Sequence, residues 1–341
     1  MLYLNDNDIQ QALTTEDVLD AVKEALQIYE ARSFSMPERL AMATGEGNQL
    51  LLMPCAAEDY MVAKLVSVYP GNRPKGRPVI DGIAVLYDRA TAAILALLDG
   101  KTITAMRTGA VTGISIRYLA PARARSVGLV GCGVQGYYQL LYACAVRDIA
   151  RIVLYDIDTL AVEALIERLR ASPVKATIEI ADSPEALARS SDILITATTA
   201  RQPVFPDDPA LFVGDRADTG DRADTGDRAD TGKHCVAIGS FEPEVREYPD
   251  ALFRLVDKVW VDLDFATEES GELIAPLRSG LLQEDQIETL GHLIASGCPP
   301  ARGRHGTTFS KSVGMALFDL TTARRAYLNA LEAGLGTELQ V

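Results

Sequence analysis

The sequence predicts an α/β protein in which a doubly wound parallel sheet of the Rossmann type follows a smaller, mixed α+β domain. From residue 126 onward, short apolar strands alternate with helical segments, which is typical of parallel sheets. Before residue 119, two helical segments precede a series of aliphatic strands. The length of 341 residues is sufficient for two domains.

The first part of the chain is expected to begin with helices and to continue with strands. Asn5 or Asp6 is expected to cap a short helix, and apolar residues at helical spacing predict a second helix over residues 15–29. A turn-rich loop is expected over residues 70–78, and a helix over residues 102–119. The expected strands cover residues 50–54, 61–68, 80–87 and 95–100.

The second part is expected to alternate between strand and helix. A long last helix, over residues 312–332, is expected to pack back on the first domain and to make that domain discontinuous. We therefore predict a first domain of residues 1–119 and 306–341 and a second domain of residues 120–305. The strands expected in the second domain cover residues 126–130, 152–156, 176–180, 193–197, 235–238 and 258–262, and helices are expected over residues 160–169 and 184–188.

A glycine-rich turn is the most informative motif. An apolar strand leads into Gly131-Cys132-Gly133-Val134-Gln135-Gly136, and a helical segment and a second strand ending in Asp156 follow. Gly131 suits a tight turn, Gly133 lets backbone N–H groups approach a pyrophosphate, and Gly136 lets the helix pack close to the sheet. Asp156 lies where a carboxylate accepts hydrogen bonds from an adenosine ribose. Parts in this order predict a dinucleotide-binding site.

Asp156 also bears on which dinucleotide binds. Its carboxylate would repel a 2′-phosphate, and no arginine follows within residues 157–159. The sequence therefore favours NAD(H), with NADP(H) as the alternative.

Residues 214–231 form a polar tandem repeat that differs in composition from the rest of the chain. The hexapeptide Gly-Asp-Arg-Ala-Asp-Thr occurs three times in succession, without the regular apolar residue that a calcium-binding β-roll needs. We interpret the segment as a tandem expansion in a polar surface loop. A site for a specific partner or ion is the alternative.

Composition argues against several classes of function. The net charge of −14 and the pI of about 4.8 make nucleic acid and anionic membrane improbable partners. The five cysteines are scattered, so neither a disulfide framework nor a metal site is expected. The N-terminus lacks the features of a signal peptide, and no apolar run is long enough to span a membrane. We expect a cytoplasmic protein.

Three cations of the first domain are candidates for binding an anion. Arg39 follows a Met-Pro-Glu turn, Lys64 lies within an apolar strand, and Arg107 lies among small and apolar residues of a helix. A buried lysine must pair with an anion or lose its proton. Cations brought together here would hold a carboxylate, which arginine binds in bidentate fashion. Ordinary ion pairs with nearby carboxylates are the alternative, and spacing does not decide between them.

Several strings resemble the ornithine cyclodeaminase/mu-crystallin family, over nearly the whole chain apart from the hexapeptide repeat. The glycine turn with Gln135 and the Arg-Thr-Gly-Ala run beginning at Arg107 are the most specific. The strings are Met36-Pro37-Glu38-Arg39, Leu51-Leu52-Met53-Pro54, Ala63-Lys64, residues 99–110, residues 131–135, Ala237-Ile238-Gly239-Ser240 and Lys311-Ser312-Val313-Gly314.

The resemblance implies a homodimer with an NAD(P)-binding Rossmann domain and a separate dimerisation and substrate domain. It implies chemistry at the Cα–N bond of amino acids or cyclic imines. Arg39, Lys64 and Arg107 would hold the substrate carboxylate, and Lys64 would also be catalytic. The cofactor would contact Thr108, Gly131, Gly133, Val134, Gln135, Asp156, Thr196 and Ser240.

One departure from the family pattern affects the expected reaction. Cyclodeaminases and the related alanine dehydrogenases have an aspartate two residues after the Ile/Val-Gly pair, where this chain has Phe241. Phenylalanine cannot accept a proton or pair with an ammonium. Glu242 or Glu244 would have to replace it, although a shift of one residue in an extended segment reverses side-chain direction.

Phe241 therefore favours an imine reductase. We expect hydride transfer to the Cα=N carbon of a small cyclic imino acid such as 1-pyrroline-2-carboxylate, giving an L-amino acid. The alternatives are ornithine cyclodeaminase, an alanine-dehydrogenase-like activity, and a mu-crystallin-like protein that binds NAD(P)H without turnover.

Overall fold

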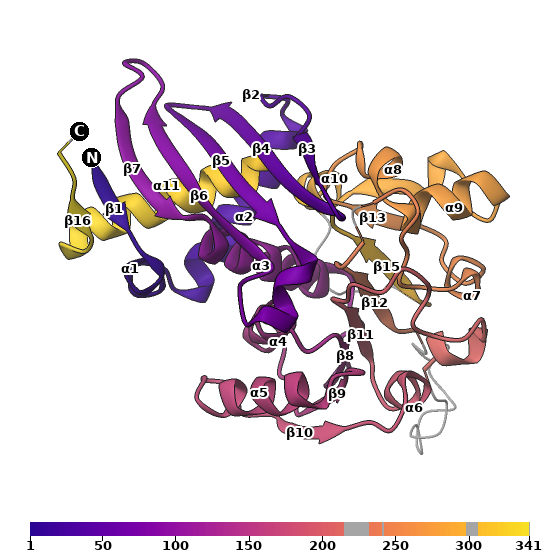
Figure 1. Ribbon diagram of the computed structural model, residues 1–341. Coiled ribbons are helices and arrows are strands. Elements are labelled where there is room, and N and C mark those ends of the chain that lie inside the picture. The colour runs from indigo at the N-terminus through magenta and orange to yellow at the C-terminus, as the bar shows by residue number, and fades with distance from the viewer. Residues whose placement is uncertain (215–231, 241, 298–305, 341) are drawn as a thin grey trace. The chain divides into compact units, whose positions relative to one another are not determined.

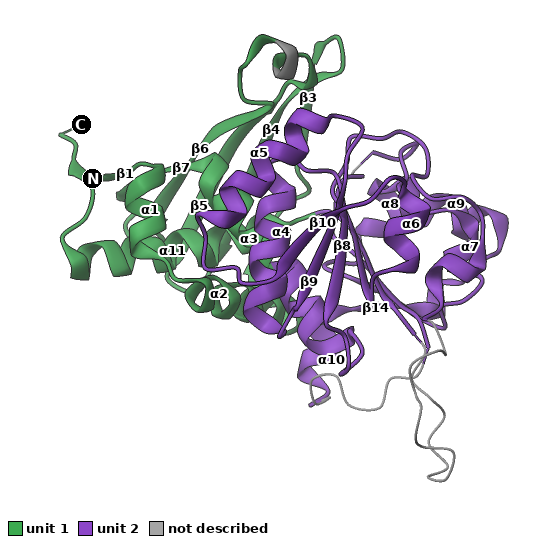
Figure 2. Ribbon diagram, turned by 90° about the horizontal axis from the view of Figure 1, so that it is seen from below, with its two compact units in different colours: residues 1–110, 314–341 green, residues 111–313 purple. Residues whose placement is uncertain are grey.

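The computed structural model describes residues 1–214, 232–240, 242–297 and 306–340. The chain forms two compact units (Figure 2): unit 1 consists of residues 1–110 and 314–341, and unit 2 of residues 111–313. The first boundary lies within α3 (Gly100–Leu119), whose last turns contribute Ile116 to the core of unit 2. We predicted boundaries at residues 119/120 and 305/306, so both observed boundaries differ in position.

Unit 1 contains a largely antiparallel sheet. Its strand order is β16-β1-β7-β6-β5-β4-β2, β3 also pairs with β4, and only β1 and β7 run parallel to each other. The aliphatic series of residues 50–100 thus forms neighbouring strands, as the sequence indicated. The strands are β1 (Leu2–Leu4), β2 (Phe34–Ser35), β3 (Leu40–Gly45), β4 (Asn48–Ala57), β5 (Tyr60–Val68), β6 (Ile80–Asp88), β7 (Ile94–Asp99) and β16 (Thr337–Glu338), and η1 (Pro70–Lys75) connects β5 and β6.

Helices cover one face of this sheet. α11 (Ala316–Ala333) packs against β4, β5, β6 and α2 (Thr15–Glu30), and α1 (Asp6–Ala12) packs against α11 (Figure 1). Asn5 and Thr14 cap α1 and α2 through reciprocal hydrogen bonds with Asp8 and Asp17. The cap predicted at Asn5 is therefore present.

Unit 2 contains a parallel sheet with the order β10-β9-β8-β11-β12-β15-β13-β14. All of its pairings are parallel, and the strand order reverses next to β8, which confirms the predicted doubly wound fold. The strands are β8 (Ser126–Val130), β9 (Arg151–Tyr155), β10 (Thr177–Ile180), β11 (Ile193–Thr196), β12 (His234–Ala237), β13 (Val259–Val261), β14 (Ile287–Thr289) and β15 (Thr308–Lys311).

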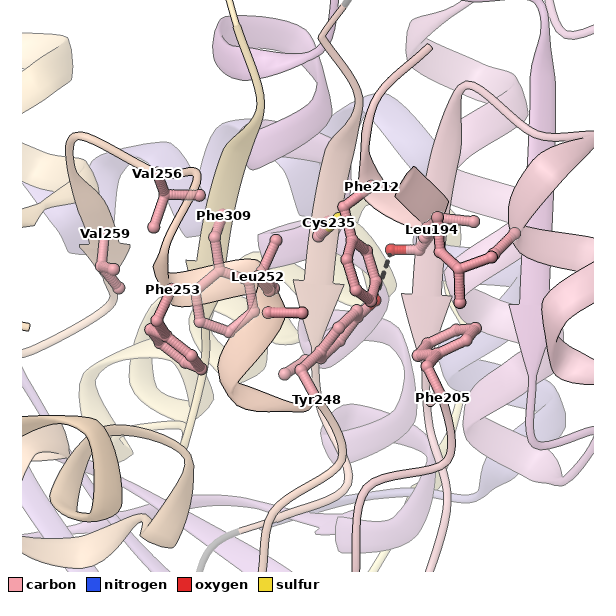
Figure 3. Close-up of a cluster of buried hydrophobic side chains, with 14 of the residues drawn as sticks. Leu194, Phe205, Phe212, Cys235, Tyr248, Leu252, Phe253, Val256, Val259 and Phe309 are labelled. Atoms are coloured by element: carbon pink, nitrogen blue, oxygen red, sulfur yellow. Dashed lines mark hydrogen bonds between the residues drawn. The ribbon is translucent and has the colours of Figure 1, made fainter. Parts of the chain in front are cut away.

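A group of aromatic side chains lies within the larger of the two hydrophobic clusters of unit 2. Phe205, Phe212 and Phe309 surround Tyr248 (Figure 3), and the Tyr248 hydroxyl donates a hydrogen bond of 2.9 Å to the Leu194 carbonyl. The helical segments of unit 2 are α4 (Val134–Val146), α5 (Thr159–Arg170), α6 (Pro184–Arg189), η2 (Pro209–Phe212), α7 (Asp250–Phe253), α8 (Ala266–Glu269), α9 (Gly271–Ser279), η3 (Glu284–Gln286) and α10 (Leu290–Ala295).

The end of the chain differs most from expectation. Residues 308–311 form β15, which inserts between β12 and β13, so these residues belong to the sheet of unit 2. The last helix consequently begins at Ala316 instead of Ser312. An all-buried strand of only four residues resembles the start of a buried helix in sequence, because neither shows alternation.

The hexapeptide repeat lies almost wholly outside the described residues. Val213 and Gly232, which flank it, form an antiparallel bridge, so the two ends of the segment are neighbours. Among the helices that the structure describes, none combines the length and apolar character needed to cross a bilayer.

Candidate functional site

The glycine turn between β8 and α4 has the backbone geometry that requires glycine. Gly131 has φ +101°, and a Cβ there would lie 2.5 Å from the Ala197 carbonyl oxygen. A Cβ on Gly136 would lie 2.4 Å from the Gly131 carbonyl oxygen. Gly133, in contrast, has no heavy atom within 4 Å of a hypothetical Cβ, so its surroundings are open.

The N-terminus of α4 begins directly at this turn. Gly133 is the N-cap, and no side chain in the described structure caps the helix. The first N–H groups of a helix lack intrahelical partners and carry partial positive charge, so they are suited to a phosphate. Val134 is 64% exposed, and Gln135 is half-buried and accepts a hydrogen bond of 3.3 Å from Gln139 Nε2.

Asp156 follows β9 and is joined to the glycine turn. Its Oδ2 accepts a hydrogen bond of 2.7 Å from the Cys132 backbone N–H, and its Oδ1 accepts one of 2.9 Å from Asp158 N–H. These bonds fix the carboxylate at the carboxyl end of the strand, where a ribose is held in dinucleotide-binding folds.

Two of the predicted cofactor contacts are buried. Thr196 and Ser240 are both fully buried. The Thr196 hydroxyl donates to the Val236 carbonyl at 3.4 Å, and the Ser240 hydroxyl lies 3.1 Å from that of Ser270. Neither residue is exposed to solvent, and their assignment as cofactor contacts stays a prediction.

A buried carboxylate that we did not anticipate joins two loops of unit 2. Glu247 accepts hydrogen bonds from the N–H and hydroxyl of Thr198, each 2.8 Å, and from the Gly239 N–H at 2.7 Å. Thr198 follows β11 and Gly239 follows β12, so Glu247 fixes two neighbouring loops at the carboxyl edge of the sheet. The sequence carried little signal for this role, because Glu247 is one of three glutamates in its loop, with Glu242 and Glu244.

Phe241, on which the choice of reaction depends, lies outside the described residues. Of its two acidic neighbours, Glu242 has its carboxylate 3.8 Å from Arg201, and Glu244 is exposed.

In unit 1 a cluster of cations forms around one carboxylate. Lys64, on β5, is 1% exposed and points toward the helix-covered face of the sheet. Its Nζ lies 2.7 Å from Asp319 Oδ2 on α11 and donates to Thr104 Oγ1 on α3 at 3.3 Å. Arg107, three residues along α3, places its Nε 3.3 Å from Asp319 Oδ1.

The environment of Lys64 lowers the pKa of its ammonium group to about 8. Burial is the largest cause, and the positive charges of Arg107 and Arg39 act in the same direction. The Asp319 carboxylate opposes them. An ammonium with this pKa exchanges its proton near neutral pH, which suits general acid–base chemistry.

Arg39 joins the cluster through the backbone. Its Nη2 donates a hydrogen bond of 2.7 Å to the Gly314 carbonyl oxygen. Gly314 has φ +79°, and a Cβ there would lie 2.5 Å from Arg107 Nη1. The structure therefore brings the three predicted cations together, with Asp319 serving as ion-pair partner of two of them.

Gly314 and Asp319 were not anticipated as site residues. The signal for Asp319 was present: it is a single acid in the apolar run Ala316-Leu317-Phe318-Asp319-Leu320, and such an acid has to find a cation when it is buried. The remaining predicted residue, Thr108, is nearly buried, and its hydroxyl donates to the Thr104 carbonyl within α3 at 2.6 Å.

A parallel sheet that reverses its strand order beside a glycine turn defines the class of dinucleotide-binding α/β proteins. Within that class the chain belongs to the ornithine cyclodeaminase/mu-crystallin family, whose sequence pattern matches residues 2–214. The resemblance inferred from the motifs is thereby confirmed.

Individual relatives match the chain over its full length. A Delta(1)-pyrroline-2-carboxylate reductase of Bacillus cereus is 30% identical, over all of both chains. The structure of Thermococcus litoralis Delta(1)-pyrroline-2-carboxylate reductase in complex with NADH and L-proline is similar with a TM-score of 0.88 and 31% identity, covering 99% of this chain and all of that one. An archaeal alanine dehydrogenase dimer with bound NAD is similar with a TM-score of 0.84 and 26% identity, and the match covers 100% of this chain and 99% of that one.

Proposed function

We propose that the protein is an NADH-dependent reductase of cyclic imino acids of the 1-pyrroline-2-carboxylate type, producing an L-amino acid such as L-proline. The observation that carries the proposal is the buried Lys64, with a pKa of about 8, in one cluster with Arg39 and Arg107. Such a cluster both binds a carboxylate and holds a transferable proton. Relatives over the full chain length carry the same activity in their names.

Unit 1 supplies the substrate-binding groups. The carboxylate of the imino acid binds to Arg107, Arg39 and the Lys64 ammonium, whose three N–H donors include one beyond those engaged by Asp319 and Thr104. This fixes the C=N carbon and nitrogen next to Lys64 Nζ.

The reduction moves one hydride and one proton. The hydride for Cα would come from NADH, which would leave as NAD⁺. The imine nitrogen takes a proton from the Lys64 ammonium as the C=N double bond becomes a C–N single bond. Lys64 is left as a neutral amine, which its pKa of about 8 permits, and regains a proton from water.

Unit 2 supplies the cofactor site. The open surroundings of Gly133 and the uncapped start of α4 fit a pyrophosphate, and Asp156 fits an adenosine ribose. We assign Val134 and Gln135 of this unit to cofactor contacts as well, and Thr108, which belongs to unit 1, keeps the cofactor role that the family resemblance implies. Ile157, next to Asp156, is 92% exposed, and residues 157–159 contain no arginine or lysine that could bind a 2′-phosphate. NADH is therefore the preferred cofactor and NADPH the weaker one.

Asp156→Ala is expected to raise the KM for NADH about tenfold, because a hydrogen bond to a charged group is lost. It should also reduce the preference for NADH over NADPH, because the repulsion between Asp156 and the 2′-phosphate is removed. Initial rates with both cofactors at saturating imino acid measure this. Asp158→Ser keeps an N-cap on α5 and is the matched control, with an unchanged KM for NADH. An unchanged cofactor preference in Asp156→Ala would place the ribose elsewhere.

The reaction itself is tested by a substrate panel. Purified protein should oxidise NADH in step with 1-pyrroline-2-carboxylate or 1-piperideine-2-carboxylate. Ammonia release from L-ornithine without net NADH change would show a cyclodeaminase, and NADH oxidation with pyruvate and ammonia an alanine dehydrogenase. NADH binding without any of these three activities would show that the protein binds the cofactor without turnover.

We further propose that the protein is a homodimer formed through the open face of the unit 1 sheet. Leu40, Leu52, Leu65 and Ile83 are cross-strand neighbours in register, so they line one face of β3, β4, β5 and β6. Each is between 39% and 59% exposed in the single chain. A contiguous apolar row of this kind is typical of a surface covered by a partner, and an archaeal relative is a dimer.

Leu65→Lys is expected to convert the dimer to a monomer, because it places a charge in the centre of this row. Light scattering coupled to size-exclusion chromatography measures the mass. Leu160→Lys alters an apolar side chain that is 72% exposed on α5 and should remain dimeric. A dimeric Leu65→Lys variant would show that another surface carries the interface.

We place the activity in the cytoplasm. The described cysteines, Cys55, Cys132, Cys144 and Cys235, are free thiols, as expected in a reducing compartment.

A further inference from the structure

The turn from β15 into α11 contributes two groups to the cation cluster that the proposed reaction does not itself use. One is the Gly314 carbonyl, which accepts the hydrogen bond from Arg39. The other is the Asp319 carboxylate, on the first turn of α11. The two groups that hold the three cations thus lie only five positions apart in the chain, whereas the cations come from other segments of unit 1.

Asp319 is fully buried. A carboxylate in such a position is retained only with strong partners, and its two oxygens are divided between two cations. Oδ2 contacts Lys64 at 2.7 Å and Oδ1 contacts Arg107 at 3.3 Å. Since Lys64 comes from β5 and Arg107 from α3, this carboxylate fixes the relative positions of both side chains.

The other ionisable groups near Lys64 act against its charge. Arg107 on α3 and Arg39 before β3 repel the ammonium, and burial adds to their effect. Cys55 on β4 has its thiol pKa raised to about 12 by burial and by Asp319, so it is neutral at working pH and provides no compensation. Asp319 is the group that favours the ammonium form.

We propose that Asp319 is a positioning residue for the reduction: it keeps the Lys64 side chain charged and orients both Lys64 and Arg107 toward the imino acid. The roles of the two cations rest on the proposed function. The interaction of Asp319 with Lys64 does not, and it can be measured without a substrate.

Gly314 lies in the same segment, and its lack of a side chain leaves room for the guanidinium of Arg107. A Cβ at this position would meet the guanidinium of Arg107, with distances of 2.5 Å to Nη1 and 3.1 Å to Cζ. The Arg107 guanidinium therefore lies directly over the Gly314 backbone, while the Gly314 carbonyl holds Arg39.

The direct test is a titration of Lys64 in the full-length protein, labelled with carbon-13 at lysine Cε and followed by NMR. The Lys64 signal is identified by its loss in Lys64→Arg. We expect its titration midpoint to fall by about one to three pH units in Asp319→Asn, the usual effect of removing an adjacent opposite charge. Asp319→Glu retains the charge, so its Lys64 midpoint should stay close to that of the wild type.

Asp192→Asn is the matched control, because Asp192 binds backbone N–H groups of Arg125 and Ser126 in unit 2 and should leave the Lys64 midpoint in place. Thermal unfolding of each variant identifies those that are folded. A midpoint in folded Asp319→Asn equal to that of the wild type would overturn the proposal, and this result would say nothing against reductase activity.

The kinetic test uses 1-pyrroline-2-carboxylate and NADH. In Asp319→Asn the decline of kcat/KM with rising pH should move to lower pH by the same interval as the NMR midpoint, with an unchanged KM for NADH. A uniform loss of rate without movement of the profile would indicate a merely structural role. An inactive wild type would refute the proposed function and leave the NMR test valid.

Gly314→Ala provides an independent variant. Displacement of Arg107 should raise the KM for the imino acid about tenfold, the effect of weakening one charge-assisted hydrogen bond, without altering the KM for NADH. Combining Gly314→Ala with Arg107→Lys, which removes the guanidinium that collides, should cost less than the product of the two single effects. Fully multiplicative effects would contradict a contact between these two residues.

Discussion

Lys64→Met is expected to lower kcat for imino-acid reduction by about a hundred- to ten-thousand-fold, the range attributed to a positioned general acid. Methionine has a similar length, but it neither donates a proton nor attracts a carboxylate. NADH oxidation under saturating imino acid measures the loss. NADH binding, followed by the change in its fluorescence, should be nearly unaffected because the cofactor motif lies in unit 2.

A control is needed because Lys64→Met leaves Asp319 with Arg107 as its remaining described ion-pair partner. Breaking a buried ion pair costs about 3–5 kcal/mol, enough to reduce the folded fraction. Thermal unfolding shows whether the Lys64→Met variant is folded under the assay conditions. Activity in the folded variant would show that water or the substrate itself supplies the proton.

The pH dependence of the wild type follows from the pKa of Lys64, which is about 8. Reduction requires the ammonium, so kcat/KM should be constant below this pH and fall about tenfold per unit above it. Oxidation of the amino acid requires the neutral amine, so its kcat/KM should rise with pH until about the same value. Profiles with the same sign for both directions would exclude Lys64 as the group that exchanges the proton.

The parts of the fold that the sequence predicts well are those with local signals. The glycine turn, the strands on either side of it and the capped helices each depend on neighbouring residues, and all are present. β15 escaped prediction because its pairing with β12 and β13 joins residues far apart in the chain. The domain boundary before the last helix shifted for the same reason.

The candidate site shows the same division. Its cations were found from motifs, whereas Asp319 and Gly314 act on residues more than 200 positions away. A sequence can indicate that a lysine in an apolar strand needs an anion, but it does not say which of many carboxylates is near. Burial of one acid in the apolar start of α11 answers that question, and only the folded chain shows it.

Arg107→Ala is expected to lower kcat/KM for the imino acid by about 10- to 150-fold, since a hydrogen bond to a charged group contributes about 1.5–3 kcal/mol. Both parameters should change: KM rises because the carboxylate is bound less tightly, and kcat falls because the imine carbon is held less accurately. The KM for NADH should remain nearly constant. Initial rates with each substrate varied in turn measure all three quantities.

The control for this variant is Arg324→Ala. Arg324 also lies in unit 1 and is largely buried, but it pairs with Glu24 and Glu58 instead of Asp319. Its removal should reduce thermal stability while leaving the KM for the imino acid unchanged, so the two arginines separate loss of packing from loss of substrate binding. If Arg107→Ala and Arg324→Ala behave alike, the carboxylate binds elsewhere, and the cluster around Asp319 stabilises unit 1 without contacting the substrate.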